Sequence, residues 1–338
     1  MKLAIIILNW NGKKLLNEFL PSVIEFSKGH DIYVVDNASK DDSVKFLQQN
    51  FPNVNAIELS KNYGYAGGYN RAVQQIDAEL LCFLNSDVRV SENWLKPIIK
   101  SFKKDRTIAI AQPKILDQKN PDLFEYAGAA GGFIDQLGYP YCRGRIFDTI
   151  EADHGQYNDE CSIFWASGAC FFIRKNIFVD LDGFDETFFA HMEEIDLCWR
   201  AHNLKQNVKY IGCSTVYHLG GASLSKNNPK KTFYNFRNSL FALTKNSHRP
   251  LFPTILLRLI LDGFAGVYFL LSGKITHTLA IIKAHVSFYS SIPDLLKFRN
   301  KQQRSSYDSH SSIVWRYFIK KRKIFQYPWV SFHVTDQL

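Results

Sequence analysis

The chain has 338 residues, of which 46% are hydrophobic and 14% aromatic, so it can bury a large core and is not intrinsically disordered. Residues 226–338 contain 18 lysines and arginines against 4 acidic residues, a net charge of about +14, whereas residues 1–225 contain 23 against 28, about −5. The basic region could bind nucleic acid, an anionic membrane surface or a phosphorylated substrate. No recognisable nucleic-acid-binding module accompanies it, so we expect no nucleic-acid partner.

The cysteines and the N-terminus indicate the compartment. The six cysteines form no Cys-x-x-Cys pair, and several lie within apolar runs, as buried free thiols do. A reducing, cytoplasmic compartment fits this pattern. The N-terminal run "LAIIIL" is shorter than the apolar part of a signal peptide and is followed by "NWNG", not by a small-residue cleavage site. We therefore expect it to be the first strand.

Short apolar runs and helical patterns alternate in the first part of the chain. The patterns predict strands at 2–8, 31–36, 55–60 and 79–84, and helices at 13–25, 43–50 and 69–76. Such a succession is typical of an α/β fold with a doubly wound, mostly parallel or mixed sheet flanked by helices. Ligands bind such sheets at the carboxyl ends of the strands.

The pattern loosens into glycine- and tyrosine-rich loops beyond residue 128 and then resumes. We predict a helix at 193–202, with an apolar stripe at helical spacing, and a strand at 208–218. From residue 229 onward the pattern is helical and is divided into segments by prolines. We accordingly predict a first domain at 1–225 and a helical, basic region at 226–338.

Two strand-like runs end on a carboxylate. Asp36 closes "DIYVVD", and Asp87 follows the strand in "CFLNSD", so both are expected at the ligand-binding edge of the sheet. A carboxylate placed there suits a hard divalent cation that is shared with substrate phosphates. An ordinary turn or helix-capping aspartate gives the same pattern.

The segment "KNYGYAGGYN" carries three glycines within five residues. Gly64, Gly67 and Gly68 could let the backbone approach a nucleotide, or they could simply form a turn at the start of a helix. A Rossmann fingerprint belongs at the first strand-to-helix turn, which here has the sequence "NWNG", and no P-loop motif occurs.

The densest group of titratable residues is "GFDETFFAHMEEIDLCWR". Glu193, Glu194 and Asp196 suit the first turn of a helix, where carboxylates are stabilised by the helix dipole. The neighbouring phenylalanines would also raise the pKa of a carboxyl group, as a general base requires. His218, at a strand end before two glycines, suits either a core position or a metal site.

Taken in order, "ILNWNG", "VVDNASKDDS", "SKNYGYAGGYN", "CFLNSD", "WASGACFFIR", "GFDETFFAHMEEIDLCWR" and "VYHLGGAS" resemble the motifs of the inverting family-2 glycosyltransferases with the GT-A fold. The resemblance covers residues 1–245 and is strongest to the rhamnosyltransferase-like branch, which builds bacterial surface polysaccharides.

The resemblance implies a role for each matched residue. The nucleotide pocket would be formed by Asn9, Asp36, Asn62, Gly67, Gly68 and Asn70. Asp87, preceded by Asn85 in place of the first aspartate of the family's Asp-x-Asp motif, would bind Mg²⁺ or Mn²⁺ together with His218. Glu194 would be the catalytic base, with the adjacent Glu193 as the alternative. Arg237 and Asn238 match a motif near the diphosphate, and the loop from Trp165 to Gly168 is expected to contact the sugar.

The implied reaction is a single displacement with inversion of configuration, in which the base takes the proton of the acceptor hydroxyl. The donor would be a nucleoside-diphosphate sugar, either dTDP-rhamnose-like or a UDP-sugar, and the acceptor a glycan or a lipid-linked molecule. The alternative is a nucleotide-sugar-binding protein without turnover. The presence of Asp87, Glu194 and His218 together argues against that alternative.

The apolar run "LFPTILLRLILDGFAGVYFLLSG" raises the question of a membrane span. Arg258 and Asp262 interrupt it, each at a cost of about 2.5–3.5 kcal/mol at a helix centre, and the charge-free piece at 263–273 is too short to cross. We predict an amphipathic helix at an anionic membrane surface, with flanking lysines and arginines on the lipid headgroups. A packed helical subdomain with a solvated basic face is the alternative. The first interpretation makes the protein cytoplasmic and peripheral, at the inner face of the cytoplasmic membrane.

Overall fold

The computed structural model describes residues 1–220, 228–301, 304–306 and 312–325. The strands are β1 (Leu3–Asn9), β2 (Asp31–Asp36), β3 (Asn55–Glu58), β4 (Leu80–Asn85), β5 (Val88–Val90), β6 (Ile108–Asp117), β7 (Gly132–Ile134), β8 (Pro140–Cys142), β9 (Arg145–Ile146), β10 (Thr149–Ile150), β11 (Glu160–Ser162), β12 (Cys170–Arg174) and β13 (Asn207–His218). The α-helices are α1 (Lys13–Phe26), α2 (Ser43–Asn50), α3 (Gly64–Val73), α4 (Leu95–Lys104), α5 (Lys175–Asp180), α6 (Glu193–Asn203), α7 (Pro229–Asn246), α8 (Leu251–Leu271) and α9 (Ile275–Lys301), with a short 3-10 turn at Glu186–Phe188 and a π turn at Trp315–Ile319.

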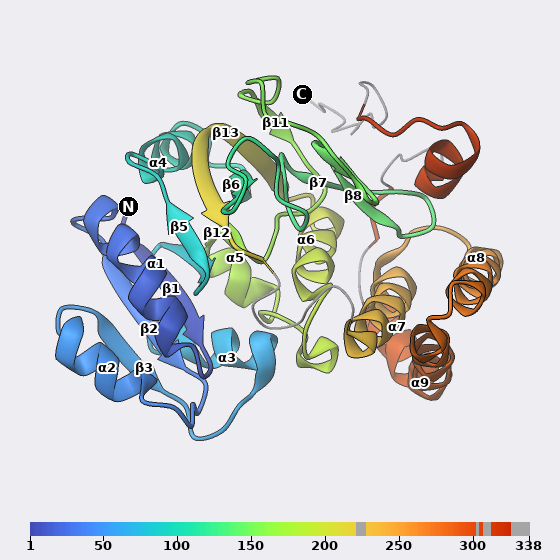
Figure 1. Ribbon diagram of the computed structural model, residues 1–338, viewed down its shortest axis with the longest axis horizontal. Helices are drawn as coiled ribbons and strands as arrows, with labels where there is room; N and C mark the ends of the chain where they lie inside the picture. The colour runs from blue at the N-terminus through green and yellow to red at the C-terminus, as the bar shows by residue number, and fades with distance from the viewer. Residues whose placement is uncertain (221–227, 302–303, 307–311, 326–338) are drawn as a thin grey trace.

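The main sheet confirms the predicted mixed sheet flanked by helices (Figure 1). Its strand order is β11-β13-β6-β12-β4-β1-β2-β3, with β5 paired to the end of β13. The pairs among β1 to β4 and the β13–β6 pair are parallel, whereas β12, β11 and β5 join antiparallel. A second sheet, β10-β9-β8-β7, lies beside it. The helix predicted at 69–76 is wrong in position, because α3 already begins at Gly64, where a left-handed glycine turns the chain into the helix.

Both faces of the main sheet are buried. Alternate residues of β1 divide between two cores: Leu3 and Ile5 face α1 and α4, whereas Ala4 and Ile6 belong to the core that contains α3, α5 and α6. Strands buried on both faces have nearly continuous apolar sequences, which is the pattern that "LAIIIL" shows.

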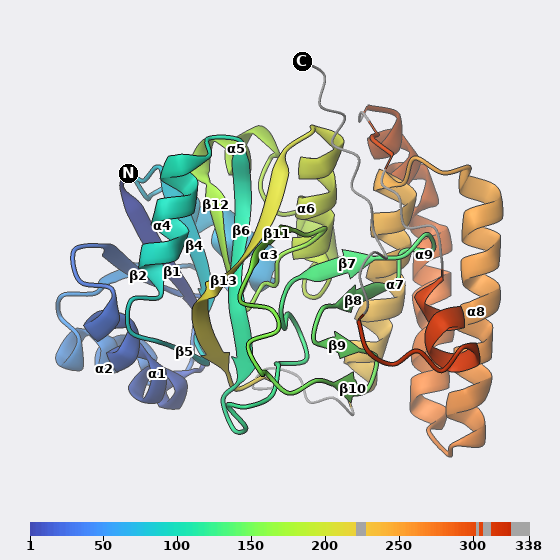
Figure 2. The ribbon, with the colours of Figure 1, turned by 90° about the horizontal axis from the view of Figure 1, so that it is seen from above.

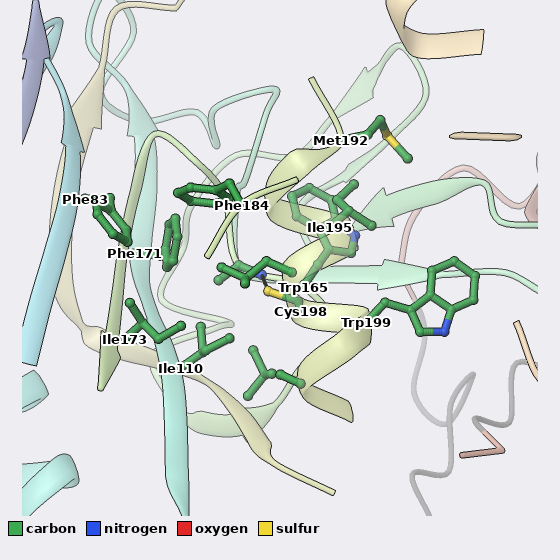
Figure 3. Close-up of a cluster of buried hydrophobic side chains, with 14 of the residues drawn as sticks. Phe83, Ile110, Trp165, Phe171, Ile173, Phe184, Met192, Ile195, Cys198 and Trp199 are labelled. Carbon is green, nitrogen blue, oxygen red and sulfur yellow. Dashed lines mark hydrogen bonds between the residues drawn. The ribbon is translucent and has the colours of Figure 1, made fainter. Parts of the chain in front are cut away.

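Aromatic and aliphatic side chains together fill the core that contains α3, α5 and α6 (Figure 3). The ring of Phe83 lies 5.2 Å from that of Phe171 and 5.4 Å from that of Phe184, and Trp199 of α6 is fully buried. Edge and tilted ring contacts of this kind add stability beyond the area they bury. They place the segment before α6 firmly against the sheet.

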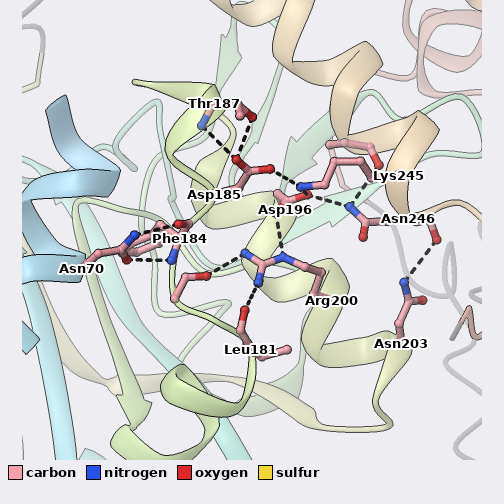
Figure 4. Close-up of polar contacts among 12 residues, drawn as sticks. Asn70, Leu181, Phe184, Asp185, Thr187, Asp196, Arg200, Asn203, Lys245 and Asn246 are labelled. Carbon is pink, nitrogen blue, oxygen red and sulfur yellow. Dashed lines mark hydrogen bonds and ion pairs between the residues drawn. The ribbon is translucent and has the colours of Figure 1, made fainter. Parts of the chain in front are cut away.

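Helices α7, α8 and α9 gather at the end of the molecule opposite α1 and α2 (Figure 2). A buried polar network joins α7 to α6 (Figure 4). The Lys245 ammonium lies 2.6 Å from Asp185 and 2.9 Å from Asp196, and Asp196 also pairs with Arg200 at 2.8 Å and accepts a hydrogen bond from Asn246. Because buried charges are tolerated only when paired, this network holds α7 in a definite place on α6. The division at residue 225 remains a prediction.

Candidate active site

The carboxyl ends of β1 and β2 bring Asn9 and Asp36 together. The two residues are paired in the sheet, and Asn9 Nδ2 donates to Asp36 Oδ1 at 2.9 Å. Ser39 donates to the same carboxylate through its hydroxyl (2.6 Å) and its backbone N–H (2.8 Å). Asn9 Oδ1 is buried, has no hydrogen-bond partner among the described residues and lies against Gly12, where a Cβ atom would clash with it.

Asn62 lies beside this pair, linked through Asn37. The Asn37 amide donates to Asn62 Oδ1 at 3.1 Å and to the Gly64 carbonyl at 2.9 Å, while its own oxygen accepts from the Tyr63 backbone at 2.9 Å. Asn62 in turn accepts from the Gly64 N–H at 2.8 Å. These bonds satisfy backbone groups at the start of α3 and fix the loop between β3 and α3.

The glycines of α3 allow this helix to pack closely on β1. A Cβ atom on Gly68 would lie 2.7 Å from a methyl group of Leu8, and one on Gly67 would also meet neighbours at about 3 Å. Asn70, one turn further on, exchanges two hydrogen bonds with the backbone of Phe184, at 2.8 and 2.9 Å. Asn70 therefore ties α3 to the segment that leads to α6.

Asp87 and His218 meet where β5 pairs with the end of β13. His218 Nε2 lies 3.1 Å from Asp87 Oδ1 and 3.5 Å from the Asn85 amide, and both Asp87 and His218 are buried. The other ring nitrogen lies 3.4 Å from Glu125 Oε1. Burial lowers the pKa of His218, but hydrogen bonds to Asp87 and Glu125 outweigh it and raise the pKa to about 10.

These residues fit a divalent cation once the His218 ring is neutral, because a cation binds the unprotonated nitrogen and would displace the proton that the carboxylates favour there. A carboxylate oxygen and an imidazole nitrogen are ligand types that Mn²⁺ and Mg²⁺ sites use, and a carboxylate behind the ring is the usual support of a metal-binding histidine. Within the described ranges, no group of three or more histidine, cysteine, aspartate or glutamate residues is arranged to hold a metal ion. Such a cation would therefore need oxygen atoms of a bound diphosphate to complete its coordination.

Glu193 and Glu194 open α6, and they differ in their surroundings. Glu193 is buried, and burial and the charge of Glu194 raise its pKa well above the usual range. Glu194 is half-buried, and burial raises its pKa to about 7, partly offset by backbone N–H groups that include that of Gly168. Its Oε2 atom has no hydrogen-bond partner in the described part of the chain. The Tyr65 hydroxyl lies nearby and donates a hydrogen bond to the Gly168 carbonyl at 2.8 Å.

Trp165 and Arg237 are engaged with the protein itself. The buried indole of Trp165 donates to the Phe133 carbonyl at 2.8 Å. Arg237 donates to the carbonyls of Thr187 and Phe188, at 3.0 and 3.1 Å. Both residues thus support the loops that surround the site.

Three site residues were not foreseen in the sequence: Asn37, Tyr65 and Glu125. Asn37 and Tyr65 lie inside motifs that drew attention for their neighbours, Asp36 and the glycines. Glu125 lies in a loop without any local pattern. Only the folded chain shows that it reaches the ring of His218.

A family model described as "Glycosyl transferase family 2" matches residues 4–181, more than half of the chain. The chain therefore belongs to glycosyl transferase family 2, and the predicted family is confirmed. Glu193, Glu194 and His218 lie beyond the matched range.

The relatives include the low-salt glycan biosynthesis hexosyltransferase Agl10 of Haloferax volcanii, 23% identical over 81% of this chain and 87% of that protein. The N-acetylglucosaminyl-diphospho-decaprenol L-rhamnosyltransferase of Mycobacterium tuberculosis is 24% identical over 64% and 75%, which supports the rhamnosyltransferase-like character. Among solved structures, GalNAc-T7 with UDP, GalNAc and Mn²⁺ superposes with a TM-score of 0.58 at 15% identity, over 74% of this chain and 48% of that one. These likenesses confirm the GT-A fold.

Proposed function

We propose that this protein is an inverting glycosyltransferase. It moves a sugar from a thymidine or uridine diphosphate to a hydroxyl group of a glycan or lipid-linked acceptor in bacterial surface polysaccharide synthesis. The observation that carries the proposal is Glu194, a half-buried carboxyl group with a pKa of about 7, whose Oε2 atom has no hydrogen-bond partner among the described residues. A general base works best when its pKa lies near the working pH.

The residues divide the work between donor and acceptor. Asn9 and Asp36 would bind the nucleoside, and Asp87 and His218 would hold the Mg²⁺ or Mn²⁺ ion. When bound, that ion neutralises charge that develops on the leaving diphosphate. Glu194 accepts the proton of the acceptor hydroxyl. The oxygen of that hydroxyl attacks the anomeric carbon on the face opposite to the leaving diphosphate, so the configuration inverts. No covalent nucleophile is needed.

Glu193 supports this assignment of the base. Burial and the charge of Glu194 raise the pKa of Glu193 well above the usual range, so its neutral form is favoured and Glu194 is the better candidate for the ionised carboxylate. We therefore choose Glu194 over Glu193 as the base.

The test compares two glutamine variants. Glu194→Gln removes the base at constant size, so turnover should fall by about 100-fold or more while nucleotide binding persists. Glu193→Gln closely mimics a protonated glutamate, so it should keep most of the activity. Equal loss in the two variants, or appreciable transfer by Glu194→Gln, would remove Glu194 as the base.

The donor and the metal are tested by thermal shift with UDP, dTDP and GDP, with and without Mn²⁺. A ligand at a hundred times its dissociation constant adds about 2.7 kcal/mol of stability, a shift that is readily measured. We expect a metal-dependent shift with dTDP or UDP that Asp87→Ala loses. Binding without transfer to any acceptor would favour the nucleotide-sugar-binding alternative, and no shift at all would contradict both functions.

We further propose that the enzyme attaches to an anionic membrane surface through α8 and α9. Within the described residues, α8 is the one helix long and apolar enough to cross a membrane, with a mean hydropathy of 1.8 and 17% of its apolar window buried. Its two charged residues, expected to interrupt its apolar surface, face the protein instead. Arg258 and Asp262 pair at 2.9 Å, Arg258 donates to Ser239, and Asp262 accepts from Tyr139.

The outward face that remains is apolar. It is formed by large side chains that are about half or more exposed: Phe252, Leu256, Ile260, Phe264, Val267, Tyr268, Leu270 and Leu271 of α8, and Ile275, Leu279, Ile282, Val286 and Tyr289 of α9. Lys274 and Lys283 lie exposed among them, and residues 320–323 add four exposed basic side chains. An apolar face combined with basic residues suits a leaflet with anionic headgroups. Because Arg258 and Asp262 are held inside the protein, we propose attachment at the surface and not a span.

Sedimentation with vesicles tests the attachment. We expect recovery with phosphatidylglycerol vesicles and little with pure phosphatidylcholine. Replacing Phe264 and Leu271 by glutamine should weaken recovery about tenfold or more, since each buries apolar surface in the lipid. Val179→Gln, at an exposed apolar residue on α5, is the control. Equal recovery with both lipids would contradict the electrostatic part of the proposed attachment. A stable dimer that does not bind vesicles would show that the apolar face contacts a second copy of the chain and not lipid.

A further inference from the structure

The loop that leads into α6 has an unusual backbone. Phe189, His191 and Met192 adopt positive φ angles of 62°, 67° and 74°, which side chains with a Cβ atom rarely adopt. Met192 caps the helix without any side-chain hydrogen bond, and Glu193 and Glu194 follow at once. Such conformations persist only where surrounding groups hold them. The position of the proposed base therefore depends on what holds this loop.

The side chain of Asn238, on α7, makes three hydrogen bonds to the backbone of this loop. Asn238, which is fully buried, places its amide nitrogen 3.0 Å from the Phe188 carbonyl, 2.9 Å from that of Ala190 and 2.7 Å from that of His191. Its oxygen accepts from Arg237 Nε at 2.8 Å, so both ends of the amide are in use. Buried carbonyl groups need hydrogen-bond donors, and here one amide group serves three of them. This contact therefore fixes the backbone of the loop.

The opposite side of the loop rests on the nucleotide side of the site. The Tyr65 backbone N–H donates to the Phe189 carbonyl at 3.2 Å, and Gly64 leaves no room for a Cβ atom there, because it would lie 2.9 Å from the same oxygen. The loop thus lies between α3 and α7. The contact of Asn238, unlike that of the Tyr65 backbone, uses a side chain that can be exchanged without touching the glycine-rich segment.

We propose that Asn238 is a positioning residue for the general base, an inference that rests on the proposed function of Glu194. The Asn238 amide holds the carbonyls of Phe188, Ala190 and His191, and so maintains the path of the loop through its positive φ angles. That path directs the first turn of α6 so that the Glu194 carboxyl lies beside Gly168 and Tyr65. This role differs from the diphosphate contact implied by the family resemblance, because the polar atoms of Asn238 are fully engaged with the loop and with Arg237.

The test uses two substitutions of different severity. Asn238→Asp keeps the shape but replaces the donor by an acceptor, and Asn238→Ser keeps one donor and introduces no charge. We expect turnover to fall about 100-fold in Asn238→Asp, as small displacements of catalytic groups do, and less in Asn238→Ser. Nucleotide affinity should stay within about threefold of wild type, because no donor-binding residue is changed. If Asn238→Asp does not fold, Asn238→Ser carries the test.

A second readout separates positioning from general stability. With the Glu194 carboxyl less confined, its burial decreases, so the acid limb of the rate profile should move down from about pH 7. Ser239→Ala is the matched control: the neighbouring residue is buried in the same helix and bonds to Arg258 of α8, not to the loop. It should leave both turnover and the acid limb unchanged.

Hydrogen exchange makes the inference independent of the activity. Amides of residues 188–196 should exchange at least about tenfold faster in Asn238→Ser than in wild type, whereas those of α1, which packs in the other core, should not change. Faster exchange with no transfer by the wild-type protein would refute the proposed function alone. Unchanged exchange together with unchanged turnover in both Asn238 variants would overturn the positioning role alone.

Discussion

The carboxyl group of Glu194 illustrates how burial sets the chemistry of a single residue. It lies in the first turn of α6, where backbone N–H groups favour the ionised form, yet burial dominates and raises the pKa to about 7. The same burial has a cost in stability. A carboxyl whose pKa is raised on folding favours the folded state below its unfolded pKa, and this contribution is lost as the pH rises through about 7.

The catalytic consequence has the opposite sign. The base must be ionised, so we expect turnover to be constant above about pH 7.5 and to fall about tenfold for each unit below pH 6.5. Turnover at saturating donor, measured from pH 5.5 to 8.5, checks this. Nucleotide binding should be followed over the same range as a control. A flat profile across that range would show that Glu194 does not titrate as the base.

Part of this site could be predicted from single residues. Asp36 and Asp87 close apolar runs, which places them at one edge of a parallel sheet, and the structure brings Asp87 to His218. The contact of Glu125 with His218 could not be predicted, because Glu125 lies 93 residues earlier in a loop whose path depends on tertiary packing. The choice between Glu193 and Glu194 also required burial, which two adjacent glutamates in a sequence do not reveal.

At the scale of elements, β6 shows why a central strand can escape notice. Residues 108–117 contain Gln112, Pro113 and Lys114, and a proline removes a ladder hydrogen bond and argues against a central strand. The neighbouring β13 accommodates it with an irregularity: Ile211 pairs with Pro113, and the next pair joins Thr215 to Lys114. The extra residues of β13 bulge at the point where the proline lies. Only the pairing of two distant segments explains the strand.

Helix α3 gives a prediction of its own. Gly68→Ala should destabilise the protein by about 1–3 kcal/mol, because the new Cβ atom would lie 2.7 Å from a Leu8 methyl group and must push α3 away from β1. Chemical denaturation measures the change. Gly263→Ala in α8 is the control: its Cβ atom meets nothing within 4 Å, so it should be neutral or stabilise by up to about 1 kcal/mol. Equal effects of the two substitutions would contradict the close packing of α3.

At the scale of the whole molecule, helix α7 packs into the same core as the strands and α6. Lys245 of α7 lies between Asp185 and Asp196, and Leu240, Phe241 and Leu243 of the same helix belong to the large core. The asymmetry of charge along the sequence predicted the division at residue 225, but net charge mainly reflects which residues lie on the surface. It could not show that α7 contributes to the interior.

A fragment of residues 1–225 should therefore not fold stably. Loss of Lys245 alone leaves the fully buried Asp196 without one of its partners, which costs about 3–5 kcal/mol for a buried pair, and apolar contacts are lost as well. Circular dichroism melting of the fragment should show no cooperative transition, in contrast to the full chain. A cooperative melt with normal nucleotide binding would establish 1–225 as an independent domain.

The place of α7 in the chain also bears on synthesis at the ribosome. Asp36 and Asp87 emerge early, but the loop before Glu194 waits for Asn238, and at about 5–20 residues per second the roughly 200 residues between Asp36 and Asn238 take about 10–40 s. The next segment to emerge is α8, with its exposed apolar face. With the roles proposed above, a nascent chain would complete its donor pocket first and acquire the positioned base and the helix proposed to meet the lipid almost together. Transfer would begin only when the enzyme is ready to reach the membrane.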